Sequence, residues 1–372
     1  MNDLEYNFWK RRISRRGFLA SLGTLIFSAP FARHAFSKTP DEPSLVYFTR
    51  DISPQGVKSL LPLVKNKLHG NIGLKVHFGE EGNTNFISPE LVRPAAEAFK
   101  ATLVETNVLY VSKRRYTESH IKLAKEHGFD FAPIDILDAG GDKFIPAKTK
   151  HFSEVRIGKN FDNYDSFLVM SHFKGHMLSG FGGAIKNISM GFASVAGKMA
   201  MHASTVPRTS PDKCILCREC EKQCPGDAIT LEPVRIDPAK CIGCGKCIGV
   251  CPVQVYDVPW SSTASPVVVE RLCEYAQVIS SLRPMTYINV LAKISKDCDC
   301  MSGAHAPFVN DIGIAASHDI VALEKASFDM VNKKLGIKDA FLKVNNVSGR
   351  PQLRYAESIG LGAASYKLID IS

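Results

Sequence analysis

The sequence has no low-complexity segment, and after residue 37 it has no basic run interleaved with aromatic residues. Its apolar stretch at 17–30 is shorter than the roughly 20 residues that a membrane-spanning helix needs. These absences argue against nucleic-acid binding and against a spanning helix at 17–30. What remains is a chain of 372 residues, 45% apolar and 22% charged, which is ordinary for a globular protein with room for about two domains.

Most of the excess positive charge lies at the N-terminus. The formal net charge is +9 at pH 7, and residues 1–37 hold six Lys/Arg against two Asp/Glu. The remaining 40 Lys/Arg and 35 Asp/Glu leave a net charge of +5, which metal-bound thiolates would lower further. We therefore expect no nucleic-acid partner.

The N-terminus has the features of an export signal. The letters S-R-R-G-F-L at 14–19 are similar to a twin-arginine motif, and A-F-S at 35–37 fits a small-x-small cleavage site. We expect residues 1–37 to be a signal peptide that the twin-arginine export machinery recognises, and the protein to reach the periplasm or cell envelope. The alternative is a basic amphipathic anchor that stays attached.

Eight of the eleven cysteines form two runs of the pattern Cys-x2-Cys-x2-Cys-x3-Cys-Pro, at 214–225 and 241–252. The runs repeat at an offset of 27 residues. In this pattern the first three thiolates surround one cluster, and the fourth, set off by proline, binds the other cluster. The segment resembles the bacterial two-cluster ferredoxin module over about 50 residues.

We therefore predict two [4Fe–4S] clusters. The first would be bound by Cys214, Cys217, Cys220 and Cys251, and the second by Cys241, Cys244, Cys247 and Cys224. Zinc is the first alternative, but zinc sites favour two Cys-x2-Cys pairs with a longer spacer. Disulfides are the second, but cysteines this dense in sequence would close strained local rings.

The rest of the chain alternates between strand-like and helix-like segments, which predicts an α/β fold with a largely parallel sheet. Strands are predicted at 45–49, 73–78, 108–111, 131–137, 165–171, 285–294 and 312–316. Helices are predicted at 54–68, 88–99, 117–127, 183–198, 265–282 and 318–334. The predicted domains are a first α/β part at 38–207, an inserted α+β ferredoxin-like module at 208–258 and a second α/β part at 259–372.

Three polar loops each follow a predicted strand, where ligands bind in parallel sheets. The first reads K-V-H-F-G-E-E-G-N-T-N at 75–85. Lys75 and His77 lie two residues apart, so a strand places both on one face. We expect them to form an acid–base set or to hold a metal. The alternative is a solvated turn with a histidine at the strand end.

The second loop reads S-H-F-K-G-H-M-L-S-G-F-G-G-A-I-K-N at 171–187 and has neither a Walker nor a Rossmann glycine pattern. Its glycines lead into a predicted helix, whose first amides would bind an anion such as a small anionic substrate. The candidates are Gly180, Gly182, Gly183 and Lys186 for the anion, with Lys174 and His176 as catalytic residues. The alternative is a tight turn that needs glycine for positive φ.

The third loop reads K-D-C-D-C-M at 296–301. Cys298 and Cys300, with the acidic residues beside them, would supply a reactive thiolate or bind an additional metal. The alternative is two packed thiols in a turn. Since parallel strands end on one side of a sheet, we expect all three loops to lie round one pocket, with the clusters close to it.

Taken together, the loop motifs and D-I-G-I-A-A-S at 311–317 resemble the family of the domain of unknown function 362, often labelled an iron–sulfur-centre protein. The resemblance runs from about 45 to about 333. It implies the inserted architecture and the cluster assignment, and it implies no particular reaction. This chain has His318-Asp319-Ile320 where the family commonly has proline after the aspartate, which leaves the start of the last long helix open.

The expected function is an exported redox protein whose two clusters carry electrons to or from a site in the α/β domain, as in an iron–sulfur oxidoreductase. One alternative is an electron carrier or docking subunit of a membrane-associated redox system. Another is an assembly or maturation factor that holds a metal at Cys298 and Cys300. In each case a redox partner protein or membrane-associated redox system is expected.

Overall fold

The computed structural model describes residues 42–372 except 204, 261 and 304. The predicted export signal therefore lies outside the described residues. Within the described part of the chain, no helix is both long and apolar enough to span a membrane.

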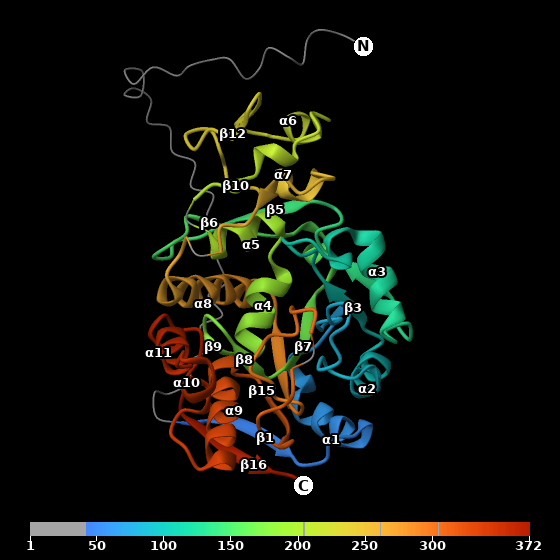
Figure 1. Ribbon diagram of the computed structural model, residues 1–372. Helices are drawn as coiled ribbons and strands as arrows, with labels where there is room; N and C mark the ends of the chain where they lie inside the picture. The colour runs from blue at the N-terminus through green and yellow to red at the C-terminus, as the bar shows by residue number, and fades with distance from the viewer. Residues whose placement is uncertain (1–41, 204, 261, 304) are drawn as a thin grey trace, which may run out of the picture. The chain divides into compact units, whose positions relative to one another are not determined.

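An eight-stranded sheet forms the centre of the fold (Figure 1). Within the described chain, seven of its strands run in one direction, and one, at 313–317, is antiparallel to both neighbours. The predicted α/β class with a largely parallel sheet is therefore confirmed. The strands in spatial order are β16 (Tyr366–Asp370), β1 (Ser44–Thr49), β15 (Gly313–Ser317), β14 (Met285–Leu291), β7 (Ser166–His172), β2 (Ile72–Lys75), β3 (Thr102–Glu105) and β4 (Ile134–Ile136).

Helices cover both faces of the sheet because successive side chains of a strand point to opposite sides. In β7, Phe167 and Val169 belong to one buried core, and Leu168 and Met170 belong to the other. The helices that pack against Leu168 and Met170 are α1 (Pro54–Val64), α2 (Pro89–Phe99) and α3 (Thr117–Glu126). Those on the opposite side are α4 (Ala184–Phe192), α8 (Ser265–Leu282), α9 (Ile320–Leu335), α10 (Ala340–Asn345) and α11 (Arg350–Ser358).

Local sequence explains where several helices begin. The hydroxyl of Ser53 accepts hydrogen bonds from the amides at the start of α1, and Ser88 does the same for α2, each with proline at the next position. Asp319 caps α9 by accepting from the amides of Val321 and Ala322. The helix therefore starts at Ile320 without the proline that the family commonly has there.

Two predictions of secondary structure are wrong. The segment 108–111 is a loop, and the strand of that region is β3. Leu109 is buried because it packs into the core of the cysteine-rich segment, so its apolar character reflects that contact. The helix predicted at 183–198 is two helices, α4 and α5 (Val195–His202), because the backbone is extended at Ala193 and Ser194, and Ser194 caps the second helix.

Smaller elements surround the sheet. Two hairpins join β5 (Asp142–Pro146) with β6 (Glu154–Gly158), and β8 (Lys174–His176) with β9 (Gly180–Gly182). The 3₁₀ turns are η1 (Lys65–Lys67), η2 (Lys113–Arg115), η3 (Lys159–Asn163) and η4 (Pro211–Lys213).

The cysteine-rich segment has its own short elements and its own buried core. It lies in sequence between β7 and β14, which are neighbours in the sheet, so both flanking parts of the chain build one sheet. Its elements are β10 (Arg208–Thr209) paired with β13 (Tyr256–Asp257), α6 (Glu219–Lys222), β11 (Ile229–Leu231) paired with β12 (Val234–Ile236), and α7 (Lys246–Val250).

The 27-residue repeat of the sequence is also a repeat of the backbone. The helices α6 and α7 start at equivalent positions of the two halves. Residues with positive φ fall at matching positions too, in the pairs Leu216 and Gly243, Arg218 and Gly245, and Asp227 and Gln254. A non-glycine residue at positive φ is uncommon, so three such pairs at one offset indicate that both halves follow the same path.

Candidate functional site

The carboxyl ends of the parallel strands bring polar residues to one edge of the sheet. Lys75 ends β2, Glu105 ends β3 and His172 ends β7, and these strands lie side by side. The loop that holds Cys298 and Cys300 follows β14, which pairs in parallel with β7. The position of each residue at a strand end thus follows from the direction of the strands.

Lys75 is completely buried and its ammonium group has three acceptors. Nζ donates to Glu105 Oε1 at 2.9 Å, Asn187 Oδ1 at 2.8 Å and the carbonyl of Val76 at 2.6 Å. Burial lowers the pKa of Lys75, and the charge of Glu105 opposes that shift. Three acceptors match the three protons of an ammonium group, which is how a buried lysine avoids an unpaired donor.

A buried arginine extends this network to the first loop. Arg114 is 2% exposed, and its guanidinium lies 3.0 Å from Nε2 of His77 and 3.4 Å from Glu105 Oε2. Burial raises the pKa of Glu105, but Lys75 and Arg114 outweigh it, so the pKa lies well below its ordinary value. Burial, reinforced by Arg114, holds the pKa of His77 well below its ordinary value, which keeps the imidazole neutral.

The third loop touches the second through Asp299 and Cys298. His172 Nδ1 lies 2.8 Å from Asp299 Oδ1, and Lys174 Nζ lies 3.4 Å from Asp299 Oδ2. Lys186 Nζ donates to Cys298 Sγ at 3.0 Å. Asp299 is 1% exposed, so its carboxylate anchors the loop inward between two partners.

The two cysteines of this loop differ in their electrostatics. The hydrogen bond with Cys300 holds the pKa of Cys298 well below its ordinary value, and the charge of Lys186 acts in the same direction against burial. The same hydrogen bond, together with burial, raises the pKa of Cys300. One thiolate and one thiol, side by side beside an ammonium group, suit thiol chemistry.

The structure thus brings Lys75, Lys174, Lys186, Cys298 and the first loop into one connected set of contacts. Asn187, which accepts from Lys75, is the next residue after Lys186 on α4. His176 is buried in its own turn, where Nδ1 lies 2.8 Å from the hydroxyl of Ser179. Its hydrogen bonds hold the hairpin rather than reaching the loop of Cys298.

The glycines of the second loop have a backbone role. Gly180 has φ of +78°, and a Cβ there would lie 2.5 Å from the backbone nitrogen of Gly349, so a side chain does not fit. The first amide of α4, at Ala184, donates to the carboxyl of Glu324. The carboxyl group of Glu324 therefore accepts from the first amide of α4, where the sequence predicts that an external anion binds near Gly182 and Gly183.

Several residues of the network were missed from the sequence. Glu105, Arg114, Asp299 and Glu324 are each at most 3% exposed, and each contacts a residue of the three loops. The apolar pattern predicts a strand at 108–111, after β3 has ended, and so it does not indicate Glu105 as the end of a strand. For Asp299 the available indication is an acidic residue that stands between two cysteines.

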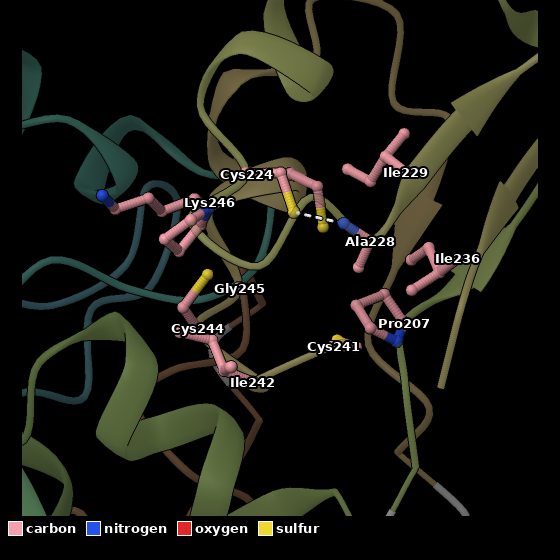
Figure 2. Close-up of a pocket in the computed structure, with 12 residues that line it drawn as sticks. Pro207, Cys224, Ala228, Ile229, Ile236, Cys241, Ile242, Cys244, Gly245 and Lys246 are labelled. Atoms are coloured by element: carbon pink, nitrogen blue, oxygen red, sulfur yellow. Dashed lines mark hydrogen bonds between the residues drawn. The ribbon is translucent and has the colours of Figure 1, made fainter. Parts of the chain in front are cut away.

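In the cysteine-rich segment, one pocket is lined by four cysteines from both runs, as Figure 2 shows in part. These are Cys224, Cys241, Cys244 and Cys247. The amide of Ala228 donates to Cys224 Sγ at 3.3 Å, and at the matching position the amide of Val255 donates to Cys251 Sγ at 3.2 Å.

Of the other predicted ligands, Cys220 and Cys251 are buried and Cys217 is exposed, while Cys214 is intermediate. The hydroxyl of Tyr256 donates to Cys220 Sγ at 3.1 Å. Among the residues that the structure describes, no three His, Cys, Asp or Glu side chains form a group with the geometry of a metal site.

The cysteine-rich segment contacts the loop after β3. Leu109 belongs to the same buried core as Cys220 and Cys251. The hydroxyl oxygen of the next residue, Tyr110, lies 3.1 Å from the carbonyl oxygen of Cys300 and 3.0 Å from Glu80 Oε2, within hydrogen-bond distance of both acceptors. Two adjacent residues therefore link the core of the segment with the loop of Cys298 and Cys300.

Comparison with known proteins identifies the family. The model of the family described as Domain of unknown function (DUF362) matches residues 72–329. The chain belongs to this DUF362 family. No curated protein matches the chain.

Two solved structures are distantly similar to the DUF362 chain. The lactate racemase apoprotein from Thermoanaerobacterium thermosaccharolyticum is 13% identical, with a TM-score of 0.35, and the match covers 68% of this chain and 52% of that one. A crystal structure of a protein from Thermotoga maritima is 9% identical, with a TM-score of 0.39, and the match covers 77% and 59%. The chain spans little more than half the length of either protein.

Proposed function

We propose that this DUF362 protein is an exported iron–sulfur redox protein. Its cysteine-rich segment would hold two [4Fe–4S] clusters, and electrons would pass between them and the polar site at the carboxyl edge of the sheet. When bound, such clusters supply one-electron transfer. The protein would work in the periplasm or cell envelope with a redox partner protein or a membrane-associated redox system.

The pocket of four cysteines supports this proposal most strongly. Cys241, Cys244 and Cys247 come from the second run, and Cys224 is the proline-flanked cysteine of the first. This is the set that the spacing predicts for one cluster, with the fourth ligand exchanged between the runs. A zinc site of paired Cys-x2-Cys motifs would have no need of that exchange.

The surroundings of the sulfur atoms also fit clusters. Backbone amides donate to Cys224 and Cys251 at equivalent positions of the repeat, and Tyr256 donates to Cys220. Hydrogen bonds to cluster sulfurs are one of the features that set reduction potentials. The matched pair of amides supports two similar sites, because each half presents its last cysteine in the same way.

A site in the α/β part is proposed because its charges are buried and paired. The side chains of Lys75 and Lys174 are at most 8% exposed, and each contacts a carboxylate. Lys186 is partly buried and contacts the Cys298 thiol. Burying several charged groups is costly, and such clusters are frequent at functional sites. The site would take a small anionic substrate.

Two other functions stay open as alternatives. A pure electron carrier or docking subunit of a membrane-associated redox system would use the cysteine-rich segment alone. An assembly or maturation factor would hold an additional metal at Cys298 and Cys300. The contact of Lys186 with Cys298 favours a site that uses the thiol, and this favours the first proposal over the carrier.

The test is the metal content of the full chain purified without oxygen. Full loading predicts about eight iron and eight sulfide per chain, from two cubane clusters. Cys244→Ser should remove the cluster of one pocket and leave about four iron, whereas Cys273→Ser, at a thiol buried in α8, should leave the content unchanged. Zinc without visible charge-transfer absorbance would overturn the proposal.

A further inference from the structure

A tight turn places Cys298 and Cys300 side by side. The amide of Met301 donates to the carbonyl of Cys298 at 3.0 Å, which closes the turn. Inside the turn, the amide of Cys300 lies 3.5 Å from Cys298 Sγ. Asp299 fixes the turn from within, because His172 and Lys174 hold its carboxylate. The two thiols are therefore neighbours on a backbone that is anchored between them.

The partner of Cys298 is a partly buried cation. Lys186 projects from α4, and its Nζ lies 3.0 Å from Cys298 Sγ. An ammonium group that is partly shielded from water is stabilised by a counter-charge, and a thiolate supplies one. The thiolate is the nucleophile in thiol–disulfide exchange, so this contact prepares Cys298 rather than Cys300 for attack.

Access to the pair is limited. Cys298 is 6% exposed, while Cys300 is partly exposed and is followed by Met301, which is 42% exposed. A folded protein is too bulky to present its disulfide to a sulfur so deeply buried. Lys186 loses its counter-charge when the Cys298 thiolate enters a mixed disulfide, and a carboxylate of the substrate can then replace it. A small disulfide with carboxylate groups matches both the restricted access and the charge.

We propose that Cys298 and Cys300 form a redox-active dithiol that reduces a small, carboxylate-bearing disulfide. This rests on the proposed function, because the reducing electrons would come through the cysteine-rich segment, whose core touches Leu109, next to the Tyr110 that contacts Cys300. The site would therefore combine a two-electron thiol reaction with a one-electron supply.

The steps balance in atoms and electrons. The Cys298 thiolate attacks one sulfur of the substrate disulfide, forms a mixed disulfide and releases one thiolate, which takes up a proton. Cys300 loses its proton and attacks Cys298 Sγ, which releases the second thiol and leaves a Cys298–Cys300 disulfide. Two electrons and two protons then restore the dithiol. The small ring is strained, and strained disulfides are the easily reduced, catalytic ones.

The experiment follows thiol oxidation by mass spectrometry. The anaerobically purified, reduced full chain is incubated with glutathione disulfide, a small disulfide with carboxylates, or with neutral hydroxyethyl disulfide. Free thiols are then alkylated, and the peptide with Cys298 and Cys300 is weighed. We expect an internal disulfide, formed about tenfold faster with glutathione disulfide. A peptide alkylated at both cysteines after incubation would overturn the proposal.

Variants separate the roles of the two cysteines. Cys300→Ser should trap glutathione on Cys298, whereas Cys298→Ser should leave Cys300 free. Lys186→Met should slow the reaction about tenfold, and Lys186→Arg should retain most of the rate. Cys273→Ser is the matched control, with unchanged kinetics. A glutathione adduct on Cys300 in the Cys298→Ser protein, formed as fast as in the wild type, would contradict the assigned roles.

The two proposals fail in different ways. Protein with about eight iron but inert Cys298 and Cys300 would overturn the dithiol and leave the redox function standing. Protein without iron that still forms the disulfide would overturn the electron supply and retain the thiol chemistry. Both measurements can be made on one preparation.

Discussion

Lys75 and Glu105 form an ion pair of 2.9 Å between the ends of adjacent parallel strands, and both side chains are at most 3% exposed. Removing Lys75 takes away the closer of the two cations that contact Glu105, and breaking a buried ion pair typically costs about 3–5 kcal/mol. Lys75→Met should therefore lower the free energy of unfolding by about that amount, measured by urea denaturation without oxygen.

The control for this variant is an exposed ion pair. Lys122 and Glu126 lie 3.9 Å apart on α3, and the Lys122 side chain is 78% exposed. Lys122→Met should change stability by less than about 0.5 kcal/mol. The double variant Lys75→Met with Glu105→Leu should recover part of the loss, because the carboxylate that has lost its closer counter-charge is then removed as well. Equal losses in Lys75→Met and Lys122→Met would contradict the interpretation.

A second prediction concerns the helix that covers Lys75. A Cβ at Gly191 would lie 2.1 Å from Lys75 Cε and 2.4 Å from its Nζ, so Gly191→Ala must displace the buried ammonium group. Alanine favours a helix over glycine by roughly 1 kcal/mol, but the displacement should outweigh this and destabilise the protein by about 2–4 kcal/mol. Thermal or urea unfolding measures the difference.

Gly249→Ala is the matched control, because Gly249 also lies in a helix and has open space around its Cβ position. It should be neutral or stabilising by up to roughly 1 kcal/mol. If both alanine variants behave alike, the close contact of Gly191 with Lys75 does not exist in solution.

The sequence was informative where local chemistry determines the backbone. Prolines after Ser53 and Ser88 mark helix starts that the structure has, and the alternating pattern gives the α/β class. The same pattern predicts that the polar loops follow strand ends. Because parallel strands end at the same edge of a sheet, this is enough to place Lys75 and the loop of Cys298 at one edge.

The sequence was less informative where contacts between residues far apart in the chain determine which side chains are buried. Nothing local marks Arg114 as buried, because its burial depends on Glu105 and His77 reaching it from other strand ends. Likewise Leu109 looks like part of a strand, although its apolar side chain packs into the cysteine-rich core. Such residues are defined by tertiary contacts that single-sequence patterns do not contain.

A third prediction concerns export. Residues 14–19 resemble a twin-arginine motif, so Arg15→Lys combined with Arg16→Lys should hold the full-length protein in the cytoplasm. Cell fractionation with an immunoblot measures this. Lys10→Arg, which keeps the charge outside the motif, is the control and should be exported normally. Normal export of the double variant would argue for another route.

The last prediction is a pH dependence that Glu324 imposes on stability. Glu324 is completely buried, and its Oε1 accepts from the amide of Ala184 and from Asn289 Nδ2. Burial raises its pKa from 4.5 to about 7, because a carboxylate loses hydration inside the protein. The folded state thus holds the proton more tightly than the unfolded state does.

The sign follows from this difference. Below pH 4.5 the carboxyl is protonated in both states and its contribution to stability is complete, and this contribution is lost as the pH rises through about 7. The loss should be at most about 3 kcal/mol between pH 4.5 and 8. Glu324→Gln keeps the acceptor oxygen without a titrating group, so relative to the wild type it should gain stability as the pH rises. Urea unfolding at pH 5 and pH 8 measures this gain. The control is Glu97→Gln, at an exposed position of α2. Its stability should differ from that of the wild type by the same amount at both pH values. A Glu324→Gln protein whose stability follows the wild type across this range would mean that Glu324 does not carry a raised pKa in the folded protein.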